Sequence, residues 1–113
     1  MSKIIIRGQF PFLPGKAEQA KTAVRILRER TLREDKGVLT YEFFTDEANK
    51  MIAVTEVYAD EAALVNHLAA SDFTALFSNV DMGKGTLQVH GNLSAEMLKT
   101  LGGVGPYQLF VPV

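Results

Sequence analysis

Two histidines and one carboxylate are the side chains in this sequence whose setting suits chemistry. His67 lies beside Leu64 and Leu68 in a helical pattern, at the seam between a helix and a predicted sheet. It is interpreted either as a base in a pocket or as a hydrogen-bonded core histidine, since perturbed titratable groups serve both purposes. One histidine without carboxylates or thiolates at ligand spacing is no metal site. His90, next to Gly91 at the end of a strand pattern, is favoured as a sheet-surface residue.

Glu56 is a carboxylate inside the otherwise apolar strand pattern 52–57. If its side chain faces inward, it needs a partner or a raised pKa, because burying an unpaired charge is costly. Arg7, in the first strand pattern, is the partner that its charge suggests. The simpler interpretation is a structural ion pair or an edge-exposed carboxylate. The functional interpretation is a base or a polar anchor in a pocket.

Aromatic side chains accompany these candidates, namely Tyr41, Tyr58, Phe73 and Phe77. Aromatic residues in a small domain fill the core first, and a subset of these could line a pocket for a flat aromatic ligand. Asn66, beside His67, could donate and accept hydrogen bonds in such a pocket, although a surface amide is the simpler account.

Several classes of site are excluded by what the sequence lacks. It has no cysteine, which rules out disulfides, thiolate zinc sites and cysteine nucleophiles. It has no glycine-rich dinucleotide motif, no phosphate-binding loop and no serine nucleophile elbow. We therefore expect no cofactor and no metal. The near balance of 12 basic and 13 acidic residues argues against a nucleic-acid surface or a polybasic membrane surface.

Length and composition favour one domain over residues 1–113, of which 47% are apolar. No apolar run is long enough for a signal sequence or a membrane span, so a cytoplasmic location is the default expectation. A chain of this size buries one modest core. A closed ligand cavity would therefore benefit from a second subunit that helps to wall it.

Periodicity and turn residues predict an α+β fold. The expected elements are a strand over 3–10, a helix over 16–34, strands over 38–45 and 50–58, a helix over 61–70 capped by Asp60, a short helix over 73–80, a strand over 83–91, a short helix capped by Ser94, a flexible break over 102–106 and an extended tail over 107–113. The order β-α-β-β-α-β over residues 1–91 is the ferredoxin-like arrangement, an antiparallel sheet with helices on one face. Residues 92–113 add a C-terminal helix and tail.

Both faces of this sheet are predicted to be apolar. On the third strand Ile52 and Val54 point one way, whereas Ala53 and Val57 point the other. The helices cover one face only, and the second would remain as a large exposed patch. We therefore expect a homodimer that packs sheet face against sheet face, with the apolar tail 107–113 at the interface.

Four segments occur in an order that is typical of one protein family. They are Leu13-Pro14-Gly15-Lys16, Lys36-Gly37-Val38-Leu39-Thr40-Tyr41-Glu42, Glu56-Val57-Tyr58, and the run from Asp60-Glu61-Ala62-Ala63-Leu64 through His67-Leu68 to Phe73. In their order and spacing they resemble the antibiotic biosynthesis monooxygenase family, of the dimeric α+β barrel superfamily. Tyr58 stands where that family has tryptophan. Ser71-Asp72 replaces its Pro-His, which removes a second histidine.

The resemblance implies a dimer with a pocket between helices and sheet. Some members oxidise quinols or polyketide hydroquinones with O₂ and without a cofactor. A small aromatic substrate of that kind is expected here, with His67 or Glu56 as base or anchor and with Tyr58, Phe73 and Phe77 lining the pocket. A related branch binds haem through an axial histidine, whose position falls at Phe77, and phenylalanine cannot ligate iron. The alternative is a non-catalytic, small-ligand-binding or stress-related dimer of the same fold.

Overall fold

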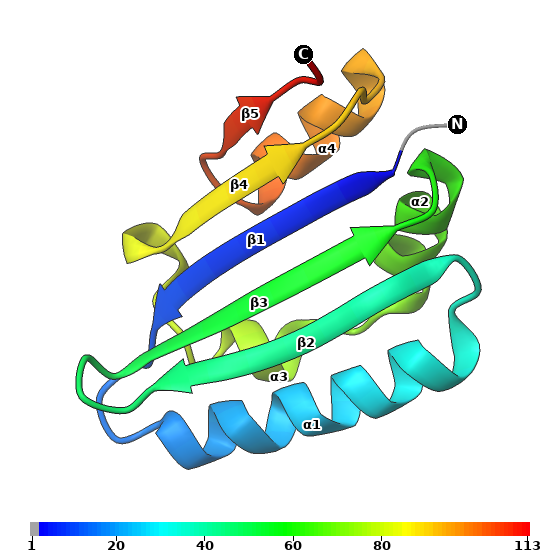
Figure 1. Ribbon diagram of the computed structural model, residues 1–113. Helices are drawn as coiled ribbons and strands as arrows, with labels where there is room; N and C mark the ends of the chain where they lie inside the picture. Colours follow the sequence, from blue (N-terminus) through cyan, green and yellow to red (C-terminus); the bar gives the residue numbers. More distant parts are fainter. Residues whose placement is uncertain (1–2) are drawn as a thin grey trace.

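A computed structural model describes residues 3–113, arranged as a sheet with one layer of helices (Figure 1). Its elements are β1 (Ile4–Pro11), α1 (Ala17–Glu34), β2 (Val38–Asp46), β3 (Met51–Tyr58), α2 (Glu61–Ala70), α3 (Thr74–Phe77), the 3₁₀ turn η1 (Met82–Lys84), β4 (Thr86–His90), α4 (Ala95–Val104) and β5 (Gln108–Phe110). The strand order is β2-β3-β1-β4-β5, and every pairing is antiparallel except that of β4 with β5. The predicted ferredoxin-like α+β fold is confirmed, with a parallel edge strand added.

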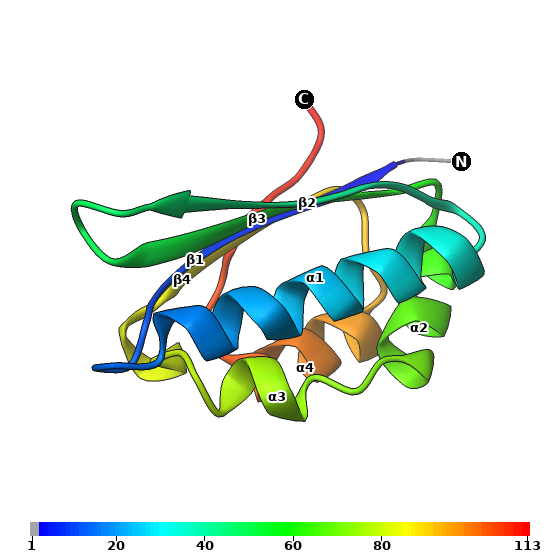
Figure 2. The ribbon, with the colours of Figure 1, turned by 90° about the horizontal axis from the view of Figure 1, so that it is seen from below.

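Successive side chains of each strand point to opposite faces of the sheet, one of which is covered by helices and the other bare. In β1 the side chains of Ile4 and Ile6 are buried, whereas Arg7 between Ile6 and Gly8 is exposed. Figure 2 shows the helices below the sheet and none above it. The apolar core therefore lies between the sheet and the helices, where any enclosed site must also lie.

The buried stripe of α1 and the start of α2 follow the sequence predictions. In α1 the buried residues are Ala20, Val24, Leu27 and Thr31, spaced by three or four as one helical stripe requires. In α2 the Asp60 side chain accepts a hydrogen bond from the backbone N–H of Ala63 at 2.9 Å, which caps the helix start as predicted. Over residues 3–113, no helix combines the length and the apolar character needed to cross a membrane.

Residues 71–85 are less helical than the sequence predicts. The helix expected over 73–80 is the four-residue α3, and the fourth strand starts at Thr86 rather than at residue 83. The Asn79 side chain donates to the Ala75 carbonyl at 2.6 Å, which satisfies a carbonyl that a further helical turn would use. Val80 forms an isolated bridge with Phe12 on the sheet side. Tertiary pairing therefore overrides the helical spacing here.

The C-terminal segment also differs from the prediction. The expected break over 102–106 is wrong for its first three residues, because α4 continues through Gly102 and Gly103 to Val104. Burial of Met97 and Leu101 against the sheet holds the helix despite the glycines. The tail then pairs with β4 of the same chain, and the N–H of Gly91 donates to the Phe110 carbonyl at 2.9 Å.

The turn after α1 is built around Gly37, which brings the end of α1 against α2. Its φ of +85° lies in the left-handed region, and a Cβ there would meet the Ala63 Cβ at 2.7 Å. The Gly37 carbonyl also accepts a hydrogen bond from the N–H of Ala59 at 2.8 Å. Only glycine combines this left-handed backbone conformation with so close an approach to Ala63. The position of Asp35 beside α2 therefore depends on Gly37.

We expect Gly37→Ala to destabilise the protein more than Gly15→Ala does. Gly15 has a similar φ of +73°, but a methyl group there would have no other atom within 4 Å, so alanine costs only about 1 kcal/mol of backbone strain. Gly37→Ala adds a steric contact with Ala63 and should cost at least about 1 kcal/mol more. Urea unfolding of both variants measures the difference. Equal losses would show that the Gly37–Ala63 contact has no energetic role.

Candidate functional site

An apolar cavity lies between the sheet and the helical layer. Its volume is about 90 Å³, and its walls come from β1, β2, β3 and β4 on one side and from α2, α3, η1 and α4 on the other. The lining residues used below are Ile6, Phe10, Tyr41, Glu56, Phe73 and Phe77. Among the described residues that line it, Glu56 alone carries a formal charge. The cavity is therefore suited to an apolar ligand with one polar group.

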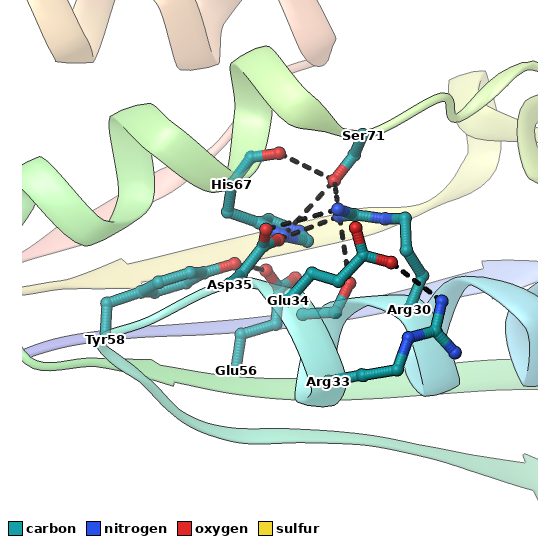
Figure 3. A network of polar contacts seen from close by, with 9 residues as sticks. Arg30, Arg33, Glu34, Asp35, Glu56, Tyr58, His67 and Ser71 are labelled. Atoms are coloured by element: carbon teal, nitrogen blue, oxygen red, sulfur yellow. Dashed lines mark hydrogen bonds and ion pairs between the residues drawn. The ribbon is translucent and has the colours of Figure 1, made fainter.

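Glu56 faces this cavity because strand alternation puts it on the covered side of β3, between Val54 and Tyr58. The Tyr58 hydroxyl donates a hydrogen bond to the Glu56 carboxylate (Figure 3). Burial raises the pKa of Glu56 from 4.5 to about 7, although the bond from Tyr58 acts in the opposite direction. Near neutral pH this carboxylate can therefore both accept and return a proton.

The prediction that Arg7 is the partner of Glu56 is wrong. Arg7 pairs with Thr55 in the β1–β3 register, whereas Glu56 pairs with Ile6. Successive residues of a strand face opposite sides, so Arg7 lies exposed on the bare face. Burial raises the pKa of Glu56, because no guanidinium is present to offset it and the bond from the neutral Tyr58 phenol only partly does so.

Tyr41 and Tyr58 flank Glu56 as neutral phenols. Tyr41 pairs with Glu56 in the β2–β3 register and lines the cavity. Burial is the main cause that raises the pKa of both phenols well above the ordinary value of 10. Both tyrosines therefore keep their protons at neutral pH and act as hydrogen-bond donors, not as bases.

His67 belongs to a buried polar network behind the cavity wall (Figure 3). Its Nδ1 lies 2.8 Å from Oδ2 of Asp35, the C-cap residue of α1. Arg30 donates to both oxygens of Asp35, at 3.2 and 2.8 Å, and also to Oγ of Ser71 at 2.7 Å. The Ser71 hydroxyl in turn donates to the His67 carbonyl at 2.6 Å. The network joins the end of α1 to both ends of the last turn of α2.

The charges in this network fix the protonation of His67. Burial opposes ionisation of Asp35, but the bonds from Arg30 and His67 outweigh it and hold the pKa of that carboxyl below its usual value. Asp35 is therefore ionised. Nδ1 of His67 carries a proton and donates a hydrogen bond to the Asp35 carboxylate. Burial lowers the pKa of His67, with Asp35 acting against that shift. The ring is neutral at pH 7, and its Nε2 is a buried acceptor without a partner among residues 3–113.

The His67 ring is separated from the cavity by aromatic side chains. Its centroid lies 4.8 Å from that of Tyr41 and 5.7 Å from that of Phe73, both of which line the cavity. His67 itself is 1% exposed and is not part of the lining. It supports the wall, and a ligand reaches Nε2 only if one of these rings moves.

The remaining sequence candidates divide into two groups. Tyr41, Phe73 and Phe77 line the cavity together with Glu56, and Tyr58 joins them through its bond to Glu56. Asn66 is exposed on α2 and outside the lining. His90 lies on the bare face of the sheet, stacked on Phe110 with ring centroids 5.0 Å apart.

Sequence reasoning missed Asp35, Arg30 and Ser71. Ser71 follows His67 by four residues, a spacing that places both on one side of a helix end. Asp35 is separated from His67 by 32 residues, and no local pattern connects them. Over residues 3–113, no group of three or more histidines and carboxylates is arranged to hold a metal ion.

The fold and the cavity together define a class of protein, namely ferredoxin-like α+β domains with an apolar cavity between helices and sheet. A model of the antibiotic biosynthesis monooxygenase family matches residues 3–79 of this chain. The chain therefore belongs to that family, as its motifs indicated. No protein of curated function matches it.

Solved structures share the fold at low sequence identity. MupZ from Pseudomonas fluorescens superposes with a TM-score of 0.75 at 23% identity, over 100% of this chain and 92% of MupZ. A Caulobacter crescentus CB15 protein, named only provisionally as an antibiotic biosynthesis monooxygenase, gives 0.68 at 19% identity, over 77% of this chain and 86% of that one. A Bacteroides thetaiotaomicron protein of unknown function, named as a possible oxidoreductase, gives 0.68 at 16% identity over 78% and 95%.

The raised pKa of Glu56 predicts a pH-dependent gain in stability for Glu56→Gln. The folded protein holds this proton more tightly than the unfolded chain does, so the stabilising contribution is full below pH 4.5 and is lost as the pH rises through about 7. Glutamine carries no such dependence. Relative to wild type, Glu56→Gln should gain on the order of 2 kcal/mol between about pH 5 and about pH 8.

Urea unfolding at the two pH values measures this difference, in which the contribution of His67 cancels because both proteins contain it. Glu42→Gln is the matched control, since Glu42 pairs with Arg28 at the surface and that hydrogen bond lowers its pKa. A pH-independent difference for Glu56→Gln would mean that Glu56 is ionised throughout.

Proposed function

We propose that this protein is a cofactor-independent monooxygenase that oxidises a small aromatic substrate, a quinol or a polyketide-like phenol, with O₂. The observation that carries the proposal is Glu56, a carboxylate with a pKa of about 7 on the wall of an otherwise apolar cavity. A base is most effective when its pKa lies near the working pH. Membership of the antibiotic biosynthesis monooxygenase family supports the same reaction class.

In the proposed reaction Glu56 takes the proton of a ring hydroxyl and makes the ring electron-rich. A ring carbon then transfers electrons to O₂ and forms a C–O bond, and the resulting peroxide takes up a proton. Cleavage of the O–O bond releases water and leaves a new carbonyl oxygen on the ring. For a hydroquinone the balance is hydroquinone plus O₂ to hydroxyquinone plus water. The substrate supplies all the electrons, so no separate reductant is needed.

The residues around Glu56 have distinct roles in this proposal. The Tyr58 hydroxyl bonds the carboxylate and orients it, and Tyr41, a neutral donor in the lining, stabilises negative charge on the substrate oxygen. Phe73 and Phe77 exclude water and contact the ring faces. Asn66 has no part, because it is exposed and outside the lining. His67 is the second candidate base, favoured by its unpartnered Nε2.

Substrate entry requires the wall to move. The cavity of about 90 Å³ is smaller than the roughly 150 Å³ that accommodates benzene in a well-studied engineered cavity. Phe73 and Phe77 stack with centroids 5.5 Å apart, and Phe77 is 38% exposed. They lie at the four-residue α3, the shortest helix of the layer, and this is the segment that we propose opens.

Oxygen uptake with a panel of hydroquinones, without added metal or flavin, tests the reaction. Wild type should consume one O₂ per substrate and place one labelled oxygen atom from labelled O₂ in the product. Glu56→Gln should lower kcat by about 10²-fold or more, because it removes the base while the cavity keeps its shape. Asn66→Ala is the matched control and should retain full activity.

His67→Ala distinguishes the two candidate bases in the same assay. If His67 only supports the wall, the variant loses about 1–3 kcal/mol of stability, because Asp35 loses a buried partner, and its activity follows the folded fraction. If His67 is the base, activity disappears from folded protein while Glu56→Gln stays active. Ligand binding with no oxygen uptake in wild type would favour a non-catalytic binding protein.

We also propose that the protein is a homodimer that joins the two bare sheet faces. That face carries Met51, Ala53 and Val57 as half-buried residues, and Phe44 with 60% of its surface exposed. No helix of residues 3–113 covers it, and the C-terminal tail rises on its side (Figure 2). Two such faces related by a two-fold axis would remove this apolar surface from water.

Sedimentation of wild type at micromolar concentration should show a dimer, and Val57→Lys should shift it toward monomer. Val57 lies on the bare face near the end of β3, opposite Ile5 of β1, and a lysine there would put an unpaired charge in the buried interface. Val65→Lys is the control, since Val65 is 48% exposed on the opposite, helical side. A Val57→Lys variant that stays dimeric would place the interface on another surface.

A further inference from the structure

Two glycines leave room for the Phe10 ring at one end of the cavity. A Cβ at Gly8 would lie 2.9 Å from the Phe10 ring, and a Cβ at Gly85 would lie 2.1 Å from it. Gly8 is in the interior of β1, where a glycine weakens a strand and often marks a close approach. The ring fills the space that two side chains would otherwise occupy, and it cannot retreat further toward the sheet.

The cavity has a polar end and an apolar end. In the β1–β3 register Ile6 pairs with Glu56, and Phe10 pairs with Ile52. Four residues along a strand span about 13 Å at ~3.3 Å per residue. Between these ends the lining runs along Val54 of β3, and the Phe10 ring, which packs over Gly8, closes the apolar end. Met82 and Leu87 are further apolar residues of the lining.

We propose that the substrate is an aromatic ring with an apolar substituent, and that Phe10 is the residue that limits the length of this substituent. The ring hydroxyl lies at Glu56, and the substituent extends along Val54 toward the Phe10 ring. This inference deepens the proposed function and rests on its aromatic substrate class. It adds that the ligand is elongated, because the single charged group of the lining is at one end and apolar residues line the cavity from there to Phe10.

Binding of 2-alkylhydroquinones of increasing chain length to the full chain, measured by calorimetry without oxygen, tests the inference. Wild-type affinity should rise about fourfold with each methylene and then stop rising when the chain reaches Phe10. Phe10→Ala should move this limit to chains several methylenes longer and leave affinity for the shortest ligands unchanged. Phe10→Leu should give an intermediate limit, and it keeps the test open if the alanine variant fails to fold.

Phe44→Ala is the matched control, since Phe44 lies on the bare face and should not change the limit. An unchanged limit in both folded Phe10 variants would overturn the inference, as would wild-type affinity that does not depend on chain length. The oxygen-uptake assay is independent of this result. A chain-length limit that moves with Phe10, in a protein that consumes no oxygen, would support the elongated pocket and reject the monooxygenase.

Discussion

The hydrogen bonds of Asp35 are the interaction on which the site depends. This one carboxylate accepts hydrogen bonds from Arg30 in the last turns of α1 and from His67 in α2. It lies next to the turn in which Gly37 packs closely against Ala63. Because His67 packs on Tyr41 and Phe73, the network also sets the position of two cavity walls. Loss of Arg30 would leave the Asp35 carboxylate without its cationic partner, at a cost of about 3–5 kcal/mol, more than the loss of the neutral His67 ring.

The protein treats two acids of its interior, the buried Asp35 and the half-buried Glu56, in opposite ways. Asp35 has a guanidinium and an imidazole as donors, so its pKa is lowered and it remains a structural anion. Glu56 has a single phenol, so burial dominates and its pKa rises to about 7. A fully compensated charge holds a structure together, whereas an incompletely compensated one is available for proton transfer. This difference, rather than residue type, makes Glu56 the better candidate for chemistry.

Two glycines next to the cavity determine its shape as much as the residues that line it do. Gly8 and Gly85 leave room for the Phe10 ring, which in turn defines where the cavity ends. The four-residue α3 is the shortest α-helix of the layer, and the stacked pair Phe73 and Phe77 lies at its two ends. In the proposed function the sheet positions the ligand, and the short helix is the segment that moves to admit it.

The sequence by itself determined the ferredoxin-like order of elements, the caps at Asp60 and Ser94, and the family, because these depend on local periodicity, local hydrogen bonds and motif spacing. It also singled out Glu56 as a carboxylate inside an otherwise apolar strand pattern. Only the tertiary structure decided that Glu56 has Tyr58 rather than Arg7 as its partner, and that His67 bonds Asp35 across 32 residues. Strand register and the packing of α1 against α2 decide those contacts, and neither leaves a local trace in the chain.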